Sequence, residues 1–530
     1  MPSSTVRLPD GQTFTVQPVF AGLFFKSHEL NKNHQSPFPI GWTIVIHTED
    51  DGRPSNDNND NNDADDDAMV VNRGDKHENG VARRSHIHSF TSPTLQNDSL
   101  YISSISNPSS ADFKPAASPT RQIAMMLWIT LYWYFHQPAP GKTLPPDENS
   151  KQTPAQGRPR GDWRINIKRD GVLRGRNLIP KLERMGLIAT LDSAVGSSMD
   201  DTSQEWANMF VSQRMFWQIP GRLFLFTLQP THRHASSHPG SPIPSRPTSP
   251  VRNERPTSPQ QPLSPSFHLN ADLPGAPPPQ TIVSVPSFPI GPFFSSSHLP
   301  TYYPPGPLHY TFTNNIRHPV RPKPPRMGEV FYTRFVPSVG KYLSLRVASS
   351  SPKPVPYLGP VSSPPSEEHH LKTMCDIVLV QMWLNNPRVS KFWGGYVPNF
   401  LTNALASRHS FPAIGMWDGV PFGYFEIYWV KEDALGRHVD VDDWDRGIHV
   451  FIGEEWARGI VQSWLSSLVH WIFCADYRTR SVCIEPRVDN ERFIQLLQGG
   501  GFIKEKEVTF PHKQSWFGRL RRENWEGPSL

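Results

Sequence analysis

The chain has 530 residues, enough for two or three domains, and 57 of these residues are proline. Hydrophobic residues make up 37%, so part of the chain cannot bury enough apolar surface to form a core. The net charge of +5 is small for this length and the basic residues are scattered. These features argue against a nucleic-acid-binding protein.

The compartment is indicated by the cysteines and by the lack of targeting segments. Three cysteines lie in apolar runs and form no CxxC pair: Cys375, Cys474 and Cys483. An odd count without a secretory leader suggests a reducing environment. The most apolar run, residues 123–135, is too short to span a bilayer, so we expect no membrane contact and a cytoplasmic protein. The final tripeptide, Pro-Ser-Leu, is similar to a peroxisomal signal without its basic middle residue, so peroxisomes stay the alternative.

The N-terminal half divides by composition into three parts. Residues 1–48 contain strand-like segments around glycine and proline turns, and residues 49–113 are predicted to be a disordered acidic and polar insertion. Residues 114–228 are predicted to be a small α/β domain with a winged-helix-like arrangement. It starts with a helix from Thr120 to His136. We find no catalytic constellation there and interpret it as a packing or regulatory domain.

The remaining segments are a linker and a second domain. Residues 229–270 read as a disordered Pro/Ser-rich linker and residues 271–329 as a Pro-rich connecting segment. The C-terminal domain is expected over residues 330–528. Strands are predicted at 330–335 and 342–347, and a helix at 375–385.

The densest apolar stretch, residues 407–502, has strands predicted at 423–430, 448–452 and 481–485. A glycine-flanked turn joins the second strand to a helix over 460–473. A helix start presents free N–H groups and favours an anion, so a phosphate-bearing cofactor fits here, and Arg458 adds charge. An ordinary strand–loop–helix connection is the alternative.

These residues carry a family resemblance. The pair Arg458-Gly459 resembles the acyl-CoA pyrophosphate loop of the GNAT N-acetyltransferase superfamily, although Ile460 and Val461 replace the usual residues after Gly459. The segment from Asn490 to Phe502 is similar to a late motif of that superfamily. More narrowly, HSFPAIGMWDGVPFGYFEIYWVKED and DRGIHVFIGEE resemble the siderophore-biosynthesis N-acyltransferases, in particular the fungal N5-hydroxyornithine transacylases and the aerobactin and mycobactin acyltransferases.

The resemblance implies an α/β (α+β) protein whose C-terminal domain has the GNAT-type mixed sheet. It implies an enzyme that transfers an acyl group from acyl-CoA to N5-hydroxy-L-ornithine and forms a hydroxamate for a siderophore. Acyl-CoA is then a co-substrate, with no permanently bound cofactor, and both acetyl and anhydromevalonyl donors stay open. The rival hypothesis is a non-catalytic binding or scaffold protein built on a degenerate acyltransferase domain.

Candidate site residues follow from the same motifs. The resemblance places acyl-CoA against Gly453, Arg458, Gly459 and Asn490. His449 is the candidate base, because imidazole titrates in the useful range and relatives have a histidine there; a structural histidine is the alternative. Relatives place an acidic residue directly after Glu-Pro. Here Arg487 holds that position, so Asp489 is the candidate acid.

Two acidic residues could bind the α-ammonium group of an amino-acid substrate. Glu426 is the one charged residue in an aromatic strand, and Asp443 could act from a nearby loop. A salt bridge from Glu426 to Lys431 or Arg437 is the structural alternative. No HxxxH pair lies on a credible helix, so we expect no metal site.

Overall fold

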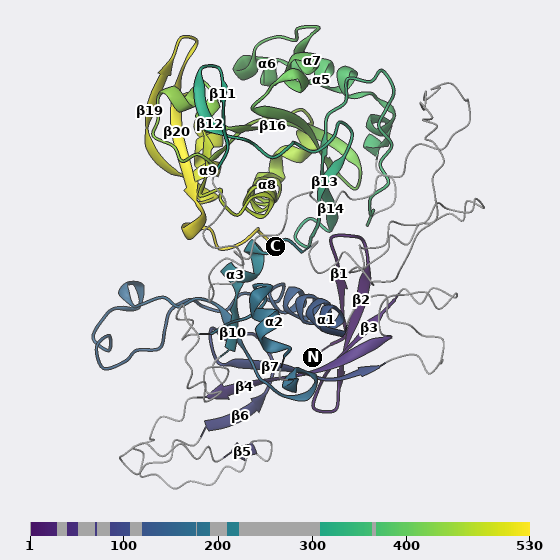
Figure 1. Ribbon diagram of the computed structural model, residues 1–530, viewed down its shortest axis with the longest axis vertical. Helices are drawn as coiled ribbons and strands as arrows, with labels where there is room; N and C mark the ends of the chain where they lie inside the picture. Colours follow the sequence, from purple (N-terminus) through teal and green to yellow (C-terminus); the bar gives the residue numbers. More distant parts are fainter. Residues whose placement is uncertain are drawn as a thin grey trace, which may run out of the picture. The chain divides into compact units, whose positions relative to one another are not determined.

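The computed structural model describes residues 2–28, 40–50, 69–71, 85–106, 119–175, 177–190, 209–221, 308–362 and 367–530. The chain divides into two compact units, of which the second is Pro230–Ile282. That unit, the predicted linker and the first part of the predicted connecting segment lie outside the described residues. All the structure below belongs to the first unit, in which each half is built around one large sheet (Figure 1).

The N-terminal sheet has the strand order β1-β2-β3-β4-β7-β8-β10-β9, and β5 and β6 attach beside β4. The strands are β1 (Ser4–Arg7), β2 (Thr13–Val19), β3 (Gly22–Ser27), β4 (Gly41–Asp50), β5 (Met69–Val71), β6 (Ser85–Ser89), β7 (Asp98–Ser106), β8 (Arg164–Ile167), β9 (Ala189–Thr190) and β10 (Met209–Ser212). Helix α1 (Pro119–Tyr134) lies between β7 and β8, α2 (Ile179–Arg184) between β8 and β9, and α3 (Gln213–Gln218) follows β10.

Part of the disordered insertion expected over 49–113 is ordered. Strand β7 lies in the middle of the sheet and buries Leu100 and Ile102 completely. The prediction of disorder is therefore wrong for residues 85–106, where the polar composition hides an alternating apolar pattern. The same sheet also joins strands from residues 1–48 to strands from the expected small domain, so the described parts of these two segments share one sheet and do not form separate domains.

The C-terminal sheet has the order β13-β14-β15-β16-β17-β18-β20-β19. Its strands are β13 (Val330–Val336), β14 (Lys341–Val347), β15 (Ser410–Trp417), β16 (Val420–Trp429), β17 (Arg446–Ile452), β18 (Ser481–Ile484), β19 (Ile503–Phe510) and β20 (Lys513–Arg521). Helices α5 (Asp376–Leu384), α6 (Pro387–Trp393) and α7 (Phe400–Ala406) lie between β14 and β15; α8 (Val461–Ala475) lies between β17 and β18, and α9 (Glu491–Gly499) between β18 and β19. A separate hairpin, β11 (Tyr310–Thr313) and β12 (Ile316–Pro319), precedes this sheet.

Strands β17 and β18 run parallel, whereas the other neighbours on this path are antiparallel. Their ladder covers only two residue pairs, Arg446 with Val482 and Gly447 with Cys483. Strand β17 then continues to Ile452 without a β18 partner. One edge of β17 is therefore free of sheet pairing just before the turn that leads into α8.

The core explains why these aromatic strands are ordered. Phe425 points to the face covered by α8, where its ring lies 5.3 Å from that of Trp464. Tyr424 points to the opposite face and stacks on Phe451 at 5.0 Å. Both sides of β16 are therefore buried, which suits its nearly continuous apolar sequence. Among the described residues, no helix is both long and apolar enough to cross a bilayer.

Helix α5 is attached to the sheet by a buried ion pair. The Asp376 carboxylate accepts two hydrogen bonds from Arg346, at 2.7 and 2.8 Å, and one from the Ser349 backbone N–H at 2.7 Å. The Arg346 and Asp376 side chains are 3% and 1% exposed. Neither charge is accessible to water, so each depends on its partner.

Replacing Asp376 by Asn leaves the Arg346 charge buried without a counter-ion. We expect the free energy of unfolding, measured by urea denaturation, to fall by about 3–5 kcal/mol. The control is Glu455→Gln, which removes an ion pair to Arg388 at two largely exposed side chains and should change stability little. Equal effects of the two variants would contradict this account of how α5 is held.

Candidate active site

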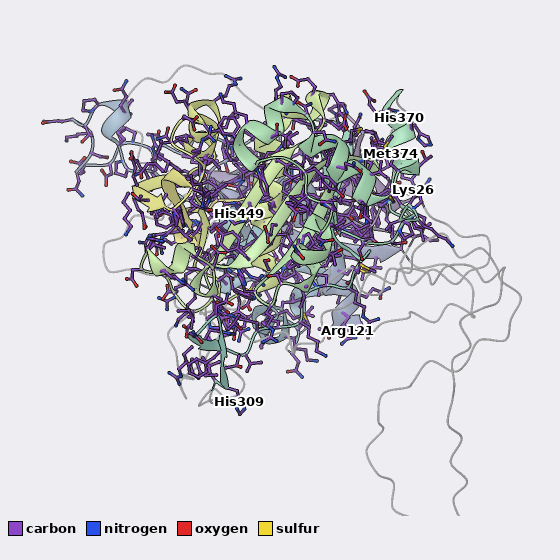
Figure 2. All side chains as sticks on the ribbon, turned by 90° about the horizontal axis from the view of Figure 1, so that it is seen from above. Lys26, Arg121, His309, His370, Met374 and His449 are labelled. Atoms are coloured by element: carbon purple, nitrogen blue, oxygen red, sulfur yellow. The ribbon has the colours of Figure 1, made fainter. Side chains whose placement is uncertain are left out.

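Three charged side chains form a row across neighbouring strands. Glu426 of β16 and His449 of β17 are direct cross-strand partners, and Glu426 Oε2 lies 3.3 Å from His449 Nδ1. Glu485, the residue after β18, places Oε1 2.7 Å from His449 Nε2. The imidazole therefore contacts a carboxylate at each nitrogen. His449 is marked in Figure 2.

The row is supported by residues around it. Tyr428 donates a hydrogen bond to Glu485 at 2.8 Å, and its ring stacks on His449 with centroids 4.4 Å apart. Gly447 makes room for that ring, because a Cβ there would lie 2.0 Å from the Tyr428 ring. Ser410 donates to the other carboxylate, that of Glu426, at 2.7 Å.

The two carboxylates keep His449 protonated. Burial lowers the pKa of His449, but the charge of Glu485 and the hydrogen bonds to both carboxylates raise it well above the usual 6.5. Burial likewise raises the pKa of Glu485, and the charge and hydrogen bond of His449 lower it to about 2. The resting row thus holds one imidazolium between two carboxylates.

Aromatic side chains pack beside His449 on the same face of the sheet. Trp393 of α6 has its ring 6.3 Å from that of His449 and 4.9 Å from that of Phe451. Its indole N–H donates to the Val450 carbonyl at 3.1 Å, on β17 just beyond the residues paired with β18. Phe400 of α7 contacts Tyr424 at 5.3 Å. Helices α6 and α7 therefore cover the end of the site next to the free edge of β17.

The expected cofactor residues lie at the turn after β17, except for Asn490. The backbone N–H of Gly453 donates to the Phe422 carbonyl, and a Cβ at Gly453 would lie 2.1 Å from the Trp383 ring. Gly453 is thus required for packing. A Cβ at Gly459, by contrast, would meet no atom within 4 Å, and Arg458 donates to the Ile452 carbonyl at 3.1 Å. Asn490 precedes α9 without capping it through its side chain.

Two predicted acidic residues have other partners. Asp489 is half exposed and forms a bidentate pair with Arg487, at 2.6 and 2.8 Å. Asp443 pairs with Lys431, so Lys431 is not the partner of Glu426. Among the described contacts, neither aspartate touches His449. Their catalytic and substrate-binding roles stay predictions.

The sequence reasoning gave no role in the site to Glu485 or Tyr428. Glu485 belongs to the same Glu-Pro string from which Asp489 was chosen, so the signal was present four residues earlier. Its contact with His449 depends on the parallel pairing of β17 with β18, which brings together positions 36 residues apart. Tyr428 follows Glu426 by two residues and so lies on the same face of β16.

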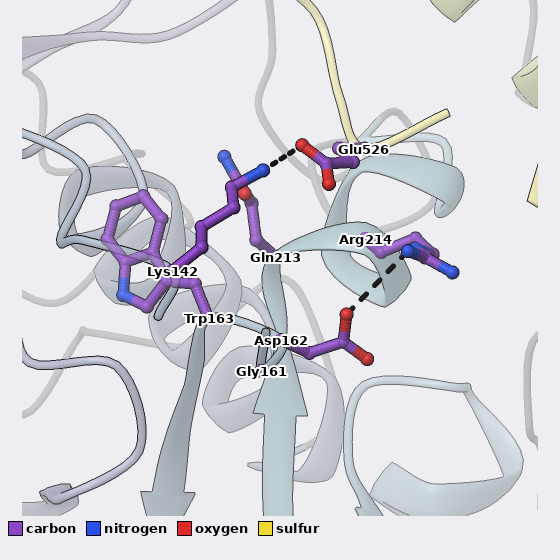
Figure 3. Close-up of a pocket in the computed structure, with 7 residues that line it drawn as sticks. All are labelled: Lys142, Gly161, Asp162, Trp163, Gln213, Arg214 and Glu526. Carbon is purple, nitrogen blue, oxygen red and sulfur yellow. Dashed lines mark hydrogen bonds and ion pairs between the residues drawn. The ribbon is translucent and has the colours of Figure 1, made fainter. Parts of the chain in front are cut away.

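A second small pocket lies away from this row. It is lined by Lys142, Gly161, Asp162, Trp163, Gln213, Arg214 and Glu526 (Figure 3). Its charges are satisfied within the pocket, because Lys142 pairs with Glu526 and Arg214 with Asp162. Nothing in this pocket provides acyl-transfer chemistry.

Replacing Glu485 by Gln keeps the shape of the side chain and removes its charge. We expect the pKa of His449 to fall toward 6.5, as followed by NMR titration of histidine-labelled protein. The stabilisation from protonated His449 is complete below the unfolded-state pKa of about 6.5 and is lost as the pH rises through the raised folded-state pKa. Asp489→Asn is the control and should leave that pKa unchanged. An unaltered pKa in Glu485→Gln would exclude the proposed charge row.

Comparison with known proteins identifies the family of this chain. Residues 372–510 match the family model described as an acetyltransferase (GNAT) domain. The chain is 54% identical over 537 residues to N5-hydroxyornithine acetylase sidL of Beauveria bassiana (strain ARSEF 2860), covering 97% of this chain and 100% of that protein. It is 36% identical to the N(6)-hydroxylysine O-acetyltransferase of Escherichia coli, over 40% of this chain and 61% of that one. It is 33% identical to N(5)-hydroxyornithine:cis-anhydromevalonyl coenzyme A-N(5)-transacylase SIDF of the same Beauveria strain, over 43% of this chain and 51% of that one. The chain therefore belongs to the siderophore-biosynthesis N-acyltransferases of the GNAT superfamily.

Proposed function

We propose that this enzyme transfers an acetyl group from acetyl-CoA to the hydroxylated nitrogen of N5-hydroxy-L-ornithine. The observation that carries the proposal is the full-length similarity to an N5-hydroxyornithine acetylase, together with the Glu426–His449–Glu485 row beside the free edge of β17. The donor would bind at the turn before α8, where Gly459 leaves space for a phosphate to approach the backbone. The charge row would then face the thioester.

The reaction forms an N–C and an S–H bond and breaks a C–S and an N–H bond. The nitrogen lone pair attacks the thioester carbonyl, the C–S bond breaks, and the proton lost from nitrogen ends on the CoA sulfur. Because His449 is protonated at rest, we place the proton acceptor at Glu426, whose side chain is 23% exposed against 3% for Glu485. A weak base suffices, since the nitrogen becomes strongly acidic only after attack. The imidazolium supplies positive charge near the developing oxyanion.

The choice of acetyl over anhydromevalonyl rests on two observations. The acetylase relative matches along the whole chain, whereas the anhydromevalonyl transacylase matches over less than half of it. The Trp393 indole occupies the space beside Val450 and Phe451, where a longer acyl chain would extend. We propose that Trp393 limits the donor to a short acyl group.

A cytoplasmic location is proposed for this enzyme. Ser529, within the tripeptide that is similar to a peroxisomal signal, donates from its backbone N–H to Ser466 Oγ at 3.0 Å. Its hydroxyl donates to the Gln462 carbonyl at 3.2 Å. Ser529 is thus held against α8, and peroxisomes stay the alternative location.

The proposed function is tested with purified enzyme, acetyl-CoA and N5-hydroxyornithine, with free CoA measured by a thiol reagent. We expect CoA release and hydroxamate formation, with kcat about a hundredfold lower in Glu426→Gln or His449→Ala. Asp489→Asn should have a weaker effect than either variant, because the Asp489 carboxylate is paired with Arg487. No CoA release from any short acyl-CoA would favour the non-catalytic scaffold alternative.

Shortening Trp393 tests the choice of donor. In Trp393→Ala, the ratio of kcat/KM for anhydromevalonyl-CoA to that for acetyl-CoA should rise by at least about tenfold, because the indole no longer fills the pocket. Phe392→Ala is the matched control, since the neighbouring ring contacts Arg487 instead of His449. An unchanged ratio in Trp393→Ala, or an equal rise in the control, would rule out this role.

A further inference from the structure

We propose that the N-terminal half is a second copy of the acyltransferase fold whose donor site is closed, and that it supports α8 instead of catalysing a reaction. Both sheets have eight strands on their main path, in the same spatial order. In each, four antiparallel pairs are followed by one parallel pair and then by two antiparallel pairs. Helix α1 crosses between the parallel strands β7 and β8, as α8 does between β17 and β18.

The strand registers allow the two halves to be aligned residue by residue. Strands β8 and β18 both have four residues, and both pair antiparallel with the strand beyond, β10 or β20. Aligning their last residues, Ile167 and Ile484, makes Ser99 equivalent to Gly447, because these residues pair with Asn166 and Cys483. The next residue on the same face of each strand is then Tyr101 in the N-terminal half and His449 in the C-terminal half.

The alignment shows that the charge row is missing from the N-terminal half. The cross-strand partner of Tyr101 is Val45, which takes the place of Glu426. The residue after β8 is Lys168, which takes the place of Glu485. Lys168 forms an ion pair with Glu49 at 2.8 Å. At the aligned positions, a valine, a tyrosine and a lysine provide neither the carboxylate acceptor nor the paired imidazolium. The His47–Glu49 pair of this half lies further along β4, with His47 opposite Ser99 and not opposite Tyr101.

The free edge of the central strand is also filled in this half. Strand β7 continues to Ser106 beyond its last pairing with β8, as β17 continues beyond β18. However, the turn Gly171–Arg174 packs against it, with Leu173 completely buried. A Cβ on Gly171, whose φ is +54°, would lie only 2.2 Å from the Ile102 carbonyl oxygen. The chain itself thus occupies the place where the other half would bind its donor.

In the C-terminal half, the backbone segment after β18 packs against β20 and not against β17. The Trp516 N–H of β20 donates to the Pro486 carbonyl at 2.9 Å, and the Val488 N–H donates to the Gln514 carbonyl at 3.0 Å. These hydrogen bonds direct the segment toward β20 and away from β17. The space beside the central strand is therefore filled by the turn Gly171–Arg174 in the N-terminal half. Among the described residues of the C-terminal half that turn has no counterpart, and the Trp393 indole of α6 contacts the strand instead.

The N-terminal copy contributes to the C-terminal half through α3. The Trp217 ring meets that of His470 on α8 edge to face at 5.6 Å, and the Trp217 carbonyl accepts a hydrogen bond from Cys474 Sγ at 3.4 Å. Trp217 is 2% exposed. Both contacts lie in the last turns of α8, whose first turn follows the proposed donor turn, so Trp217 packs against the end of the helix away from that turn.

The test uses the full chain and acetyl-CoA, with binding stoichiometry from calorimetry and backbone protection from hydrogen exchange. We expect one equivalent per chain and protection of residues 446–461, with none in 98–106. A second equivalent, or protection of β7, would overturn the proposal. Lys168→Ala should leave stoichiometry and turnover unchanged. This arm rests on the proposed function, and failure to bind acetyl-CoA at all would count against that function.

The scaffold role has a test that needs no ligand. Trp217→Ala should make exchange of the α8 amides about tenfold faster, because the helix loses buried contacts. Lys168→Ala is the control and should leave α8 exchange unchanged. Native exchange rates in Trp217→Ala would refute the scaffold role, whether or not acetyl-CoA binds.

Discussion

The active site depends on one cross-strand contact, the pairing of His449 with Glu426 on adjacent antiparallel strands. Register fixes this pair, and a shift of one strand by one residue would place the two side chains on opposite faces of the sheet. The parallel strand β18 then delivers Glu485 to the other side of the imidazole. Three strands are therefore needed to assemble the row, and the raised pKa of His449 is a consequence of that assembly.

The same sheet provides the place for the donor. Because the parallel pairing ends after Gly447, the rest of β17 has a free edge that leads to the turn before α8. In the N-terminal half, the same topology carries a closing turn and an altered row. A single architecture thus supports an open site with the charge row in one half and a packed site without that row in the other. The two sites differ because the segment after β8 packs against β7, whereas the backbone segment after β18 packs against β20.

Much of the C-terminal fold could be predicted from the sequence, because its strands and helices carry strong local signals. The aromatic run around Phe425 and the helix after Gly459 both appear where patterning predicts them. Strand β7 was missed since polar residues surround Leu100 and Ile102. His449 and Glu426 were identified singly. Their pairing, and the part played by Glu485, could not be predicted, because both depend on strand neighbours that are distant in sequence.

We expect His449 to be an imidazolium at neutral pH, and the pH profile of kcat/KM tests this expectation. Native enzyme and His449→Gln should be compared with the same nucleophile, so that titration of the substrate is common to both. The account predicts that the native profile has no inflection near pH 6.5 that the variant lacks, because the two carboxylates move the pKa of His449 well above that value. An inflection near pH 6.5 that disappears in His449→Gln would show a histidine that is neutral when it acts, and would contradict the account.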